Sequence, residues 1–527
     1  MISTLMLVII PSAGIGSRLD LHTKYFNKSM IQLGDTPVIS KIIDSYPINT
    51  NFLVLTGYKG DHIKEYLKIV YPKRNIRFKN IKLFEGPGSG LSYTLRQSIS
   101  LIDQPFFFHA NDTIFSDKYF FKNINKDTMF LSKNNCDTMK YATVEISNSK
   151  KKIHNKLNYL RKDYFNYTGV AYISNINLFK KLIKKDKKNN GEFIYFKSLD
   201  PNKIDYKFVK NWFDIGSKET KEKAEKFFAK KSILPKYDQG IFFKKKKVYK
   251  FFTNPETIKK RFNRSKILNT FVPKLLYKKN FFYVYNYVEG KVFSKIENKE
   301  KKFLKLLNWL NEKFWIRKNL NKIRYEEFSQ HCNNFYYEKS LSRINYLYEK
   351  NNLSDNNELI NNTKVEKISN IFKKIDWKKL NSGSPVNFHG DLHFENIITN
   401  KNRFTLLDWR EDFDGIINYG DIYYDLAKLN HGLIIDHNII KNSNFDVIKH
   451  KNKINIKYYQ SQINKNCQKI LFNFIKREKL SLYKVQILTG LIFLNISGLH
   501  HFPYSIFLYY LGKLHLHNSI NNIKLSF

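Results

Sequence analysis

One short segment combines residue types and a spacing that suit phosphoryl transfer. It reads HGDLHFENI, from His389 to Ile397, and Asp408 follows at the end of the strand-like run 404–408. Transfer of a phosphoryl group from a nucleotide needs a carboxylate that orients the attacking hydroxyl, and an amide oxygen and a second carboxylate that hold Mg²⁺. Asp391, Asn396 and Asp408 offer these groups in this order.

Two other interpretations of this segment are weaker. A metal site built from His389, Asp391 and His393 would lack the further Cys or His that zinc sites normally contain. A polar surface loop would not need this combination of residue types and spacing. The segment therefore favours phosphoryl transfer.

A second candidate site directly follows the strand-like run 5–10, in the sequence PSAGIGSRL. Gly14 and Gly16 let the backbone approach a phosphate closely, and a loop that enters a helix points its N–H groups at an anion. Arg18 adds a cation that can form paired hydrogen bonds with phosphate oxygens. Glycine loops also open dinucleotide-binding folds, but the third glycine of that pattern would fall at Leu19, which disfavours that alternative.

Two carboxylates complete this second set. Asp112 follows the strand-like run 106–109, and open α/β sheets place ligands at the C-terminal ends of their strands. Asp214 lies in the sequence WFDIG. Two carboxylates and a nucleoside triphosphate suit one or two Mg²⁺ ions. A single aspartate after a strand is more often part of a surface turn, so the prediction depends on the combination.

The elements around these residues predict an α/β fold in the N-terminal part. Strand-like runs at 5–10, 52–56 and 106–109 alternate with helical patterns at 37–46, 61–71 and 91–102, and a further strand is expected at 170–174. This alternation predicts a doubly wound, mostly parallel sheet with helices on both faces. A helix at 218–231 and a linker at 232–240 divide the chain into predicted domains at 1–231 and 241–527. In the second domain we expect strands at 248–252 and 281–288, a polar loop at 353–362 and a buried helical hairpin within 485–510.

The N-terminal pattern, over about 5–225, resembles the nucleotidyltransferases that make nucleoside-diphosphate sugars and CDP-alcohols. Two departures from the family pattern, Pro11-Ser12 and Asn27, remove no functional group. By this resemblance Arg18 and Lys28 are catalytic, Asp112 and Asp214 bind Mg²⁺, and the nucleotide is bound by Ala13, Gly14, Gly16, Ser17, Arg18, Gly88 and Gly90.

The C-terminal part, over roughly 240–515, resembles the aminoglycoside phosphotransferase and choline kinase family, which is related to protein kinases. The resemblance is sharp only over 386–430. It implies an α+β bilobal kinase-like domain in which Asp391 is the catalytic base, Asn396 and Asp408 bind Mg²⁺, and Lys250 binds ATP phosphates. Asp425 is expected to support the loop rather than touch substrate. The following helix, 257–269, contains no glutamate that could pair with Lys250.

Composition limits the remaining function classes. The net charge is +45, which suits a polyanion partner, but the lysines are spread along the whole chain. This scatter favours a compositional bias over a specific nucleic-acid interface. Three cysteines without a Cys-x-x-Cys pair fit a reducing, cytoplasmic location. No uninterrupted apolar run predicts a transmembrane segment, and the oligomeric state is left open.

The two sites together predict a bifunctional transferase. A kinase makes a phosphomonoester, and a nucleotidyltransferase of this type consumes one, so ATP and a second nucleotide (CTP, UTP, GTP or dTTP) would be substrates with Mg²⁺ as cofactor. Small molecules are the expected partners, in the synthesis of cell-surface polysaccharides such as capsule or lipopolysaccharide. We favour a sugar 1-phosphate as the coupled group. The alternatives are a choline or ethanolamine kinase joined to a CTP:phosphocholine-type cytidylyltransferase, and a non-catalytic nucleic-acid-binding or regulatory protein.

Overall fold

A computed structural model describes residues 6–19, 21–117, 120–133, 136–147, 150–228, 238–401 and 403–521. The chain forms two compact units. The first unit comprises residues 1–255 and 279–284, and the second comprises 256–278 and 285–527.

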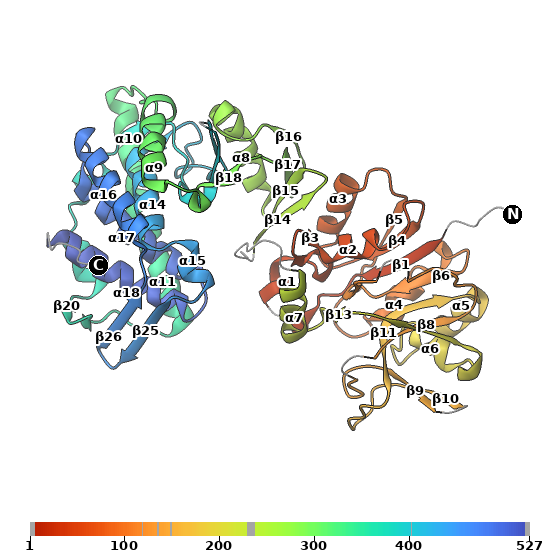
Figure 1. The fold of residues 1–527 in the computed structure, drawn as a ribbon. Helices are drawn as coiled ribbons and strands as arrows, with labels where there is room; N and C mark the ends of the chain where they lie inside the picture. The colour runs from red at the N-terminus through yellow and green to blue at the C-terminus, as the bar shows by residue number, and fades with distance from the viewer. Residues whose placement is uncertain are drawn as a thin grey trace. The chain divides into compact units, whose positions relative to one another are not determined.

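The first unit is built on a nine-stranded mixed sheet (Figure 1). Its central strand, β1 (Leu7–Ser12), pairs in parallel with β4 (Asn51–Thr56) and with β6 (Phe106–His109), and β4 pairs in parallel with β5 (Ile76–Asn80). β1 and β4 are apolar and almost wholly buried, as expected of parallel strands covered on both faces. The α/β prediction for this part is therefore confirmed, with the parallel strands gathered at one end of the sheet, where β5 is the edge strand.

Antiparallel strands extend this sheet beyond β6. The order continues through β11 (Phe165–Ile173) to the hairpin of β9 (Thr143–Ser147) and β10 (Lys150–His154). A branch leads from β11 to β8 (Thr128–Ser132), which pairs in parallel with β12 (Asp205–Val209). The other elements of this part are α1 (Leu21–Tyr25), β2 (Gln32–Leu33), β3 (Thr36–Pro37), α2 (Val38–Asp44), α3 (Gly60–Val70), α4 (Leu91–Arg96), β7 (Thr113–Phe115), α5 (Ile176–Lys185), α6 (Phe193–Lys197), β13 (Trp212–Asp214) and α7 (Lys218–Phe228).

The hairpin of β14 (Gln239–Lys244) and β15 (Lys247–Phe252) also belongs to the first unit. It packs on α3, where the Tyr66 ring lies 5.3 Å from that of Phe242 in β14. The ring of Phe282, which begins β17 (Phe282–Asn286), lies 5.8 Å from Tyr66. Glu65 of the same helix accepts the N–H of Phe281 at 2.8 Å. The predicted linker at 232–240 lies largely outside the described residues, so the predicted domain boundary stays a prediction.

The second unit is rich in helices (Figure 1). Its core is one large cluster that includes Trp315, Phe388, Trp409 and both long C-terminal helices, α17 (Leu482–Ser497) and α18 (Tyr504–Ile520). These two helices pack on each other, which confirms the predicted helical hairpin. Among the described residues, no helix is long and apolar enough to cross a membrane.

The remaining elements of the C-terminal part form short strands and further helices. They are α8 (Pro255–Leu268), β16 (Leu275–Lys278), β17 (Phe282–Asn286), β18 (Lys291–Val292), α9 (Lys299–Trp309), α10 (Lys322–Asn333), α11 (Lys339–Asn351), β19 (Glu358–Ile360), β20 (Thr363–Val365), α12 (Ile368–Lys374), α13 (Trp377–Asn381), β21 (Pro385–Val386), β22 (Ile397–Asn400), β23 (Arg403–Leu406), β24 (Gly420–Asp421), α14 (Ile422–Ile434), α15 (His437–Lys441), β25 (Phe445–His450), β26 (Lys453–Tyr458) and α16 (Gln462–Arg477).

The predicted polar loop at 353–362 is wrong in its second half, which contains β19. Glu358 at the start of that strand is buried and forms a 2.6 Å ion pair with Lys513 of α18, whose side chain is fully buried. A polar local sequence can therefore form a buried strand because its charged residue has a partner far along the chain.

Candidate active sites

The first candidate site lies at the C-terminal ends of β1 and β6. The loop after β1 leads through Gly14 and Gly16 into a short turn of helix, Ser17–Leu19. A cleft of about 240 Å³ opens beside this loop. It is lined by Pro11, Ala13, Gly14, Gly16, Lys28, Phe84, Ser89, Gly90, Leu91, Thr94 and Asn111. Most of the predicted nucleotide-binding residues of the first glycine loop thus face one cleft.

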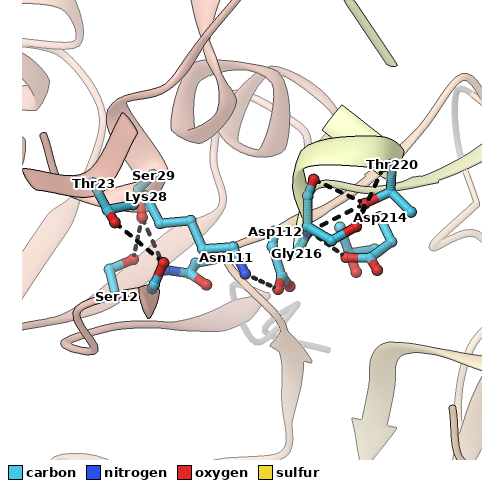
Figure 2. A network of polar contacts seen from close by, with 12 residues as sticks. Ser12, Thr23, Lys28, Ser29, Asn111, Asp112, Asp214, Gly216 and Thr220 are labelled. Atoms are coloured by element: carbon cyan, nitrogen blue, oxygen red, sulfur yellow. Dashed lines mark hydrogen bonds and ion pairs between the residues drawn. The ribbon is translucent and has the colours of Figure 1, made fainter. Parts of the chain in front are cut away.

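Lys28, which lines this cleft, forms a partly buried ion pair with Asp112 (Figure 2). Burial alone would raise the pKa of Asp112, but the charge and hydrogen bond of Lys28, with a contribution from Arg18, lower it. Asp112 is therefore held ionised by two cations predicted to act on phosphate. Such a carboxylate can bind a divalent cation without first losing a proton.

Asp214 lies near Asp112 because it ends β13, which pairs with β7, the strand that begins directly after Asp112. β13 runs antiparallel to β7, and Ile215 donates its N–H to the carbonyl oxygen of Asp112 at 2.9 Å. Tyr141 donates its hydroxyl to Asp214 Oδ2 at 2.8 Å, and the Gly216 N–H donates to Oδ1 at 2.7 Å. Burial, followed by repulsion from Asp112, raises the pKa of Asp214.

Two facing carboxylates with opposite pKa shifts suit a shared cation. Within the described residues no group of three or more metal-binding side chains is present, so Asp112 and Asp214 could supply only part of a Mg²⁺ coordination sphere. Nucleotide phosphates and water would complete it, as is usual for this ion. Arg18 lies beside Asp214, because both side chains approach Gly216. A Cβ atom built on that glycine would lie 3.4 Å from Arg18 Nη2 and 2.8 Å from Asp214 Oδ1.

Asn27, which departs from the family pattern, holds Lys28 in place. Its amide donates to the carbonyl oxygens of Ser12 and Tyr58 at 3.0 and 2.8 Å, and its Oδ1 accepts the N–H of Ser29. The Ser29 hydroxyl accepts from Asn111 at 3.1 Å and donates to Ser12 at 3.0 Å (Figure 2). The residues before and after Lys28 are thus tied to β1 and to the loop that carries Asp112.

The second glycine loop closes the cleft from the other side. Gly90 has φ +138°, and a Cβ there would lie 2.2 Å from the amide nitrogen of Asn189. Asn189 Oδ1 in turn accepts the N–H of Ser92 at 2.8 Å. Gly90 lines the cleft, whereas Gly88 is not among its lining residues.

Glu192 is a buried residue near this site that the sequence did not single out. It accepts the Tyr167 hydroxyl at 3.0 Å. Burial raises its pKa to about 7, and Asp112 adds to this effect. No sequence signal marks Glu192, because its partners come from distant strands.

The second candidate site is organised around Asp425 of α14. Asp425 accepts the N–H groups of His389 and Gly390 at 2.8 and 2.7 Å, and the indole N–H of Trp315 at 3.1 Å. Burial raises the pKa of Asp425 to about 6. Gly390 has φ +82°, and a Cβ there would lie 2.6 Å from that of Arg410, so only glycine fits. Asp425 thus supports the loop, as expected, and does so from inside the core.

The structure brings Asp391, Asn396 and Asp408 together. The Asn396 amide donates to the carbonyl oxygen of Asp391 at 2.9 Å, and the Leu407 N–H donates to the carbonyl oxygen of Asn396 at 2.7 Å. Asp408 follows with φ +60°, a conformation that few residues other than glycine, Asn and Asp adopt easily. Asn396 and Asp408 could hold Mg²⁺ beside Asp391, the predicted base, with the remaining ligands supplied by nucleotide phosphates.

Arg261 of α8 is an unforeseen neighbour of Asp408. Its Nη1 lies 2.9 Å from Asp408 Oδ1, and its Nη2 lies 3.4 Å from Glu411 Oε2. Beyond Glu256 in its first turn, this helix contains no glutamate, and this is the sequence signal that could have found Arg261, because the helix carries a cation toward the carboxylates instead. Lys250 is buried in β15 of the first unit, whereas the other predicted kinase residues lie in the second, so its role stays a prediction.

Several solved structures are similar to the N-terminal part of the chain. No protein-family model matches the sequence, and no curated protein matches it. Among solved structures, a protein assigned as a glucose-1-phosphate thymidylyltransferase from Bacillus anthracis is 19% identical, with a TM-score of 0.36, over 44% of this chain and 98% of its own. A UDP-glucose pyrophosphorylase bound to UDP-glucose is 16% identical, with a TM-score of 0.36, over 43% and 98%.

A third similar structure is the CTP:phosphocholine cytidylyltransferase of Streptococcus pneumoniae. It is 16% identical, with a TM-score of 0.34, over 42% of this chain and 99% of its own. All three are nucleotidyltransferases by name. With identities and TM-scores this low, none of them assigns an activity to this chain.

Proposed function

We propose that the first unit is a nucleotidyltransferase that couples a phosphomonoester to a nucleoside triphosphate and releases pyrophosphate. The observation that carries the proposal is the grouping of Arg18, Lys28, Asp112 and Asp214 beside a cleft lined by two glycine loops. Two cations suit the phosphates of a nucleoside triphosphate, and two carboxylates near the ends of parallel strands suit the metal ion bound to it.

In this proposal the chain binds and orients, and no protein nucleophile takes part. The glycine loop and Arg18 bind the triphosphate, and Lys28 neutralises charge on the phosphate. Mg²⁺ held by Asp112 and Asp214 would stabilise charge on the phosphate oxygens. A phosphomonoester oxygen attacks the α-phosphorus, the bond to the β-phosphate oxygen breaks, and pyrophosphate leaves. The attacking oxygen is already ionised, so the step needs no general base, and alignment supplies much of the rate.

We propose further that the second unit is a kinase for a small hydroxyl compound. Asp391 and Asn396 support this proposal through their location on a loop held by Asp425, and Asp408 through its position after β23, where the preceding Leu407 is hydrogen-bonded to Asn396. The substrate oxygen attacks the γ-phosphorus of ATP, its proton passes to Asp391, and ADP leaves. Its product would be a phosphomonoester, the kind of substrate that the first unit needs. A sugar 1-phosphate for cell-surface polysaccharides is the combination we favour, with phosphocholine as the alternative.

Two single substitutions separate the proposed activities. We expect Asp391→Ala to abolish ATP-dependent phosphorylation and to leave pyrophosphate release from a supplied phosphomonoester intact. Asp112→Ala should do the reverse. Products of the full-length chain with Mg²⁺, ATP and each second nucleotide would be read by mass spectrometry, with hexoses and choline as acceptors. Equal loss of both activities in either variant would contradict the assignment of two separate sites.

A binding function without catalysis predicts a different outcome. A basic nucleic-acid-binding protein would bind oligonucleotides with an affinity that falls steeply with salt and shows no sequence preference. It would also give no product with any acceptor. Intact acidic residues at both sites favour catalysis over this alternative.

A further inference from the structure

Cations from three segments of the second unit gather around Asp391. Lys428 of α14 lies with its Nζ 2.7 Å from Asp391 Oδ1, and it is 8% exposed. The backbone of Arg410 lies beside the loop that carries Asp391, because its N–H donates to the carbonyl oxygen of His389 at 2.9 Å. Lys339, the first residue of α11, supplies a third charge.

Two of these cations, Lys339 and Arg410, lie over the same aromatic ring, Phe335. Lys339 Nζ lies 3.9 Å from the centre of this ring, and the Arg410 guanidinium carbon lies 4.8 Å from it. Phe335 also packs at 4.9 Å on Tyr424, which precedes Lys428 by one turn of α14. Lys339, Arg410 and Lys428 therefore face a common region next to the proposed base.

Lys428 is paired with Asp391, whereas the other two cations have little acidic charge close by. In the part of the chain that the structure describes, no carboxylate lies within 4.0 Å of Lys339 Nζ. Arg410 reaches Glu411 only at 4.0 Å, and Glu411 is shared with Arg261. Burial, followed by repulsion from Arg410 and Arg343, holds the pKa of Lys339 well below its usual value.

Polar atoms without partners lie in the same region. The Arg410 Nε and both ring nitrogens of His431 are buried and form no hydrogen bond with any described residue. His431 follows Lys428 by three residues on α14, so the two side chains share one face of the helix. Cations partly withdrawn from water and unsatisfied donors are costly by themselves, and a bound anion lowers that cost.

We propose that the acceptor phosphorylated at Asp391 carries an anionic group, a phosphate or a carboxylate, that Lys339, Arg410 and Lys428 bind beside its reacting hydroxyl. This inference rests on the proposed kinase function of the second unit. It disfavours choline and ethanolamine, because their positive charge would be repelled by the same side chains that attract an anion. A phosphorylated or acidic sugar fits the cluster, and its kinase product would carry the new phosphate in addition to the anionic group.

The first test compares acceptors with the full-length chain, Mg²⁺ and ATP. Glucose, glucose 6-phosphate, glucuronate and choline would be offered separately, and phosphorylated products would be quantified by mass spectrometry. We expect kcat/KM to be at least tenfold higher for an anionic sugar than for glucose, with no choline product. Phosphorylation of choline, or of glucose as efficiently as of the anionic sugars, would overturn the inference and leave the kinase function standing.

The second test removes one cation. Lys339→Met should raise the KM for the anionic acceptor at least tenfold and leave the KM for ATP unchanged, while Lys339→Arg retains most of the affinity. Lys373→Met, which removes an exposed lysine of α12, is the matched control. A rise in the KM for ATP instead would show that the cluster binds the γ-phosphate of the nucleotide, which would overturn the assignment to the acceptor.

A binding measurement separates the inference from the kinase activity itself. Inorganic phosphate is the probe, and the thermal midpoint of the chain is read with and without it. Phosphate should raise the thermal midpoint of the wild type and of Lys373→Met by similar amounts. It should raise the thermal midpoint of Lys339→Met by less. If no acceptor is phosphorylated and this difference is present, the kinase function fails and the anion site stands. If phosphate stabilises all three proteins equally, the anion site fails.

Discussion

Removing the charge of Lys28 should expose how far the first site depends on its ion pair. In Lys28→Met, Asp112 loses its ion-pair partner while it stays beside Asp214, a second carboxylate whose pKa it raises. Removing one partner of a buried pair typically costs 3–5 kcal/mol. Asp112 retains 21% exposure of its side chain, so we expect the lower end, about 3 kcal/mol, in the free energy of unfolding of the first unit.

Hydrogen exchange read by mass spectrometry can isolate this loss, because the amides of β1 and β4 report opening of the first unit alone. A loss of about 3 kcal/mol corresponds to roughly 100-fold faster exchange of these amides at neutral pH. Peptides from α17 and α18 in the second unit, measured in the same sample, should be unchanged. They are the internal control.

The companion variants are Asp112→Asn and the double variant. If the cost of Lys28→Met comes from the unpaired carboxylate, it should fall below about 1 kcal/mol in the Asp112→Asn background, giving a coupling of about 2 kcal/mol. The reasoning would be refuted if Lys28→Met cost the same in both backgrounds. It would also be refuted if β1 exchanged at the wild-type rate.

Three further predictions follow from contacts described above. Burial raises the pKa of Glu192 to about 7, so between about pH 4.5 and 7 the folded wild type binds a proton that the unfolded chain lacks, and the stability of its first unit falls as pH rises. Glu192→Gln should flatten this pH dependence, and a wild-type urea midpoint that stays constant across the window would contradict the reasoning. Arg261→Met should cost the second unit about 3 kcal/mol in urea unfolding, because Asp408 and Glu411 lose a shared partner, and Arg261→Lys should recover about half. Gly90→Ala should raise the KM for the nucleotide and lower the thermal midpoint, because its Cβ would displace Asn189, whereas Gly86→Ala, with φ +79° and no described atom within 4 Å, is the milder matched control.

Local patterns predicted the elements that carry the sites. The strand at 106–109 was placed to the residue, and with it the position of Asp112 at a strand end. The apolar runs that form β1 and β4 are buried on both faces, which is why their composition is so easily recognised. The loop from His389 to Asn396 was also located, because its residue types are unusual together.

Contacts between distant segments could not be predicted in this way. Tyr141 reaches Asp214 across 73 positions, and Asn189 reaches Ser92 across 97. Arg261 meets Asp408 across 147 positions, although nothing in the local helical pattern selects that arginine. A single sequence shows which residues prefer a helix or strand, but not which of many lysines, arginines and tyrosines will find a given carboxylate.

The way the chain is divided between the two units limits where it could be truncated or its gene split. The chain passes between the two units three times, after residues 255, 278 and 284. A stop codon in the predicted linker would leave α3 without the residues that cover Tyr66, namely Phe242 and Phe282. No single break therefore yields two complete halves. Splitting the gene into two would require residues of the crossing region, about 239–284, on both products. The two proposed activities have separate sequence motifs, but we expect them to be inherited together.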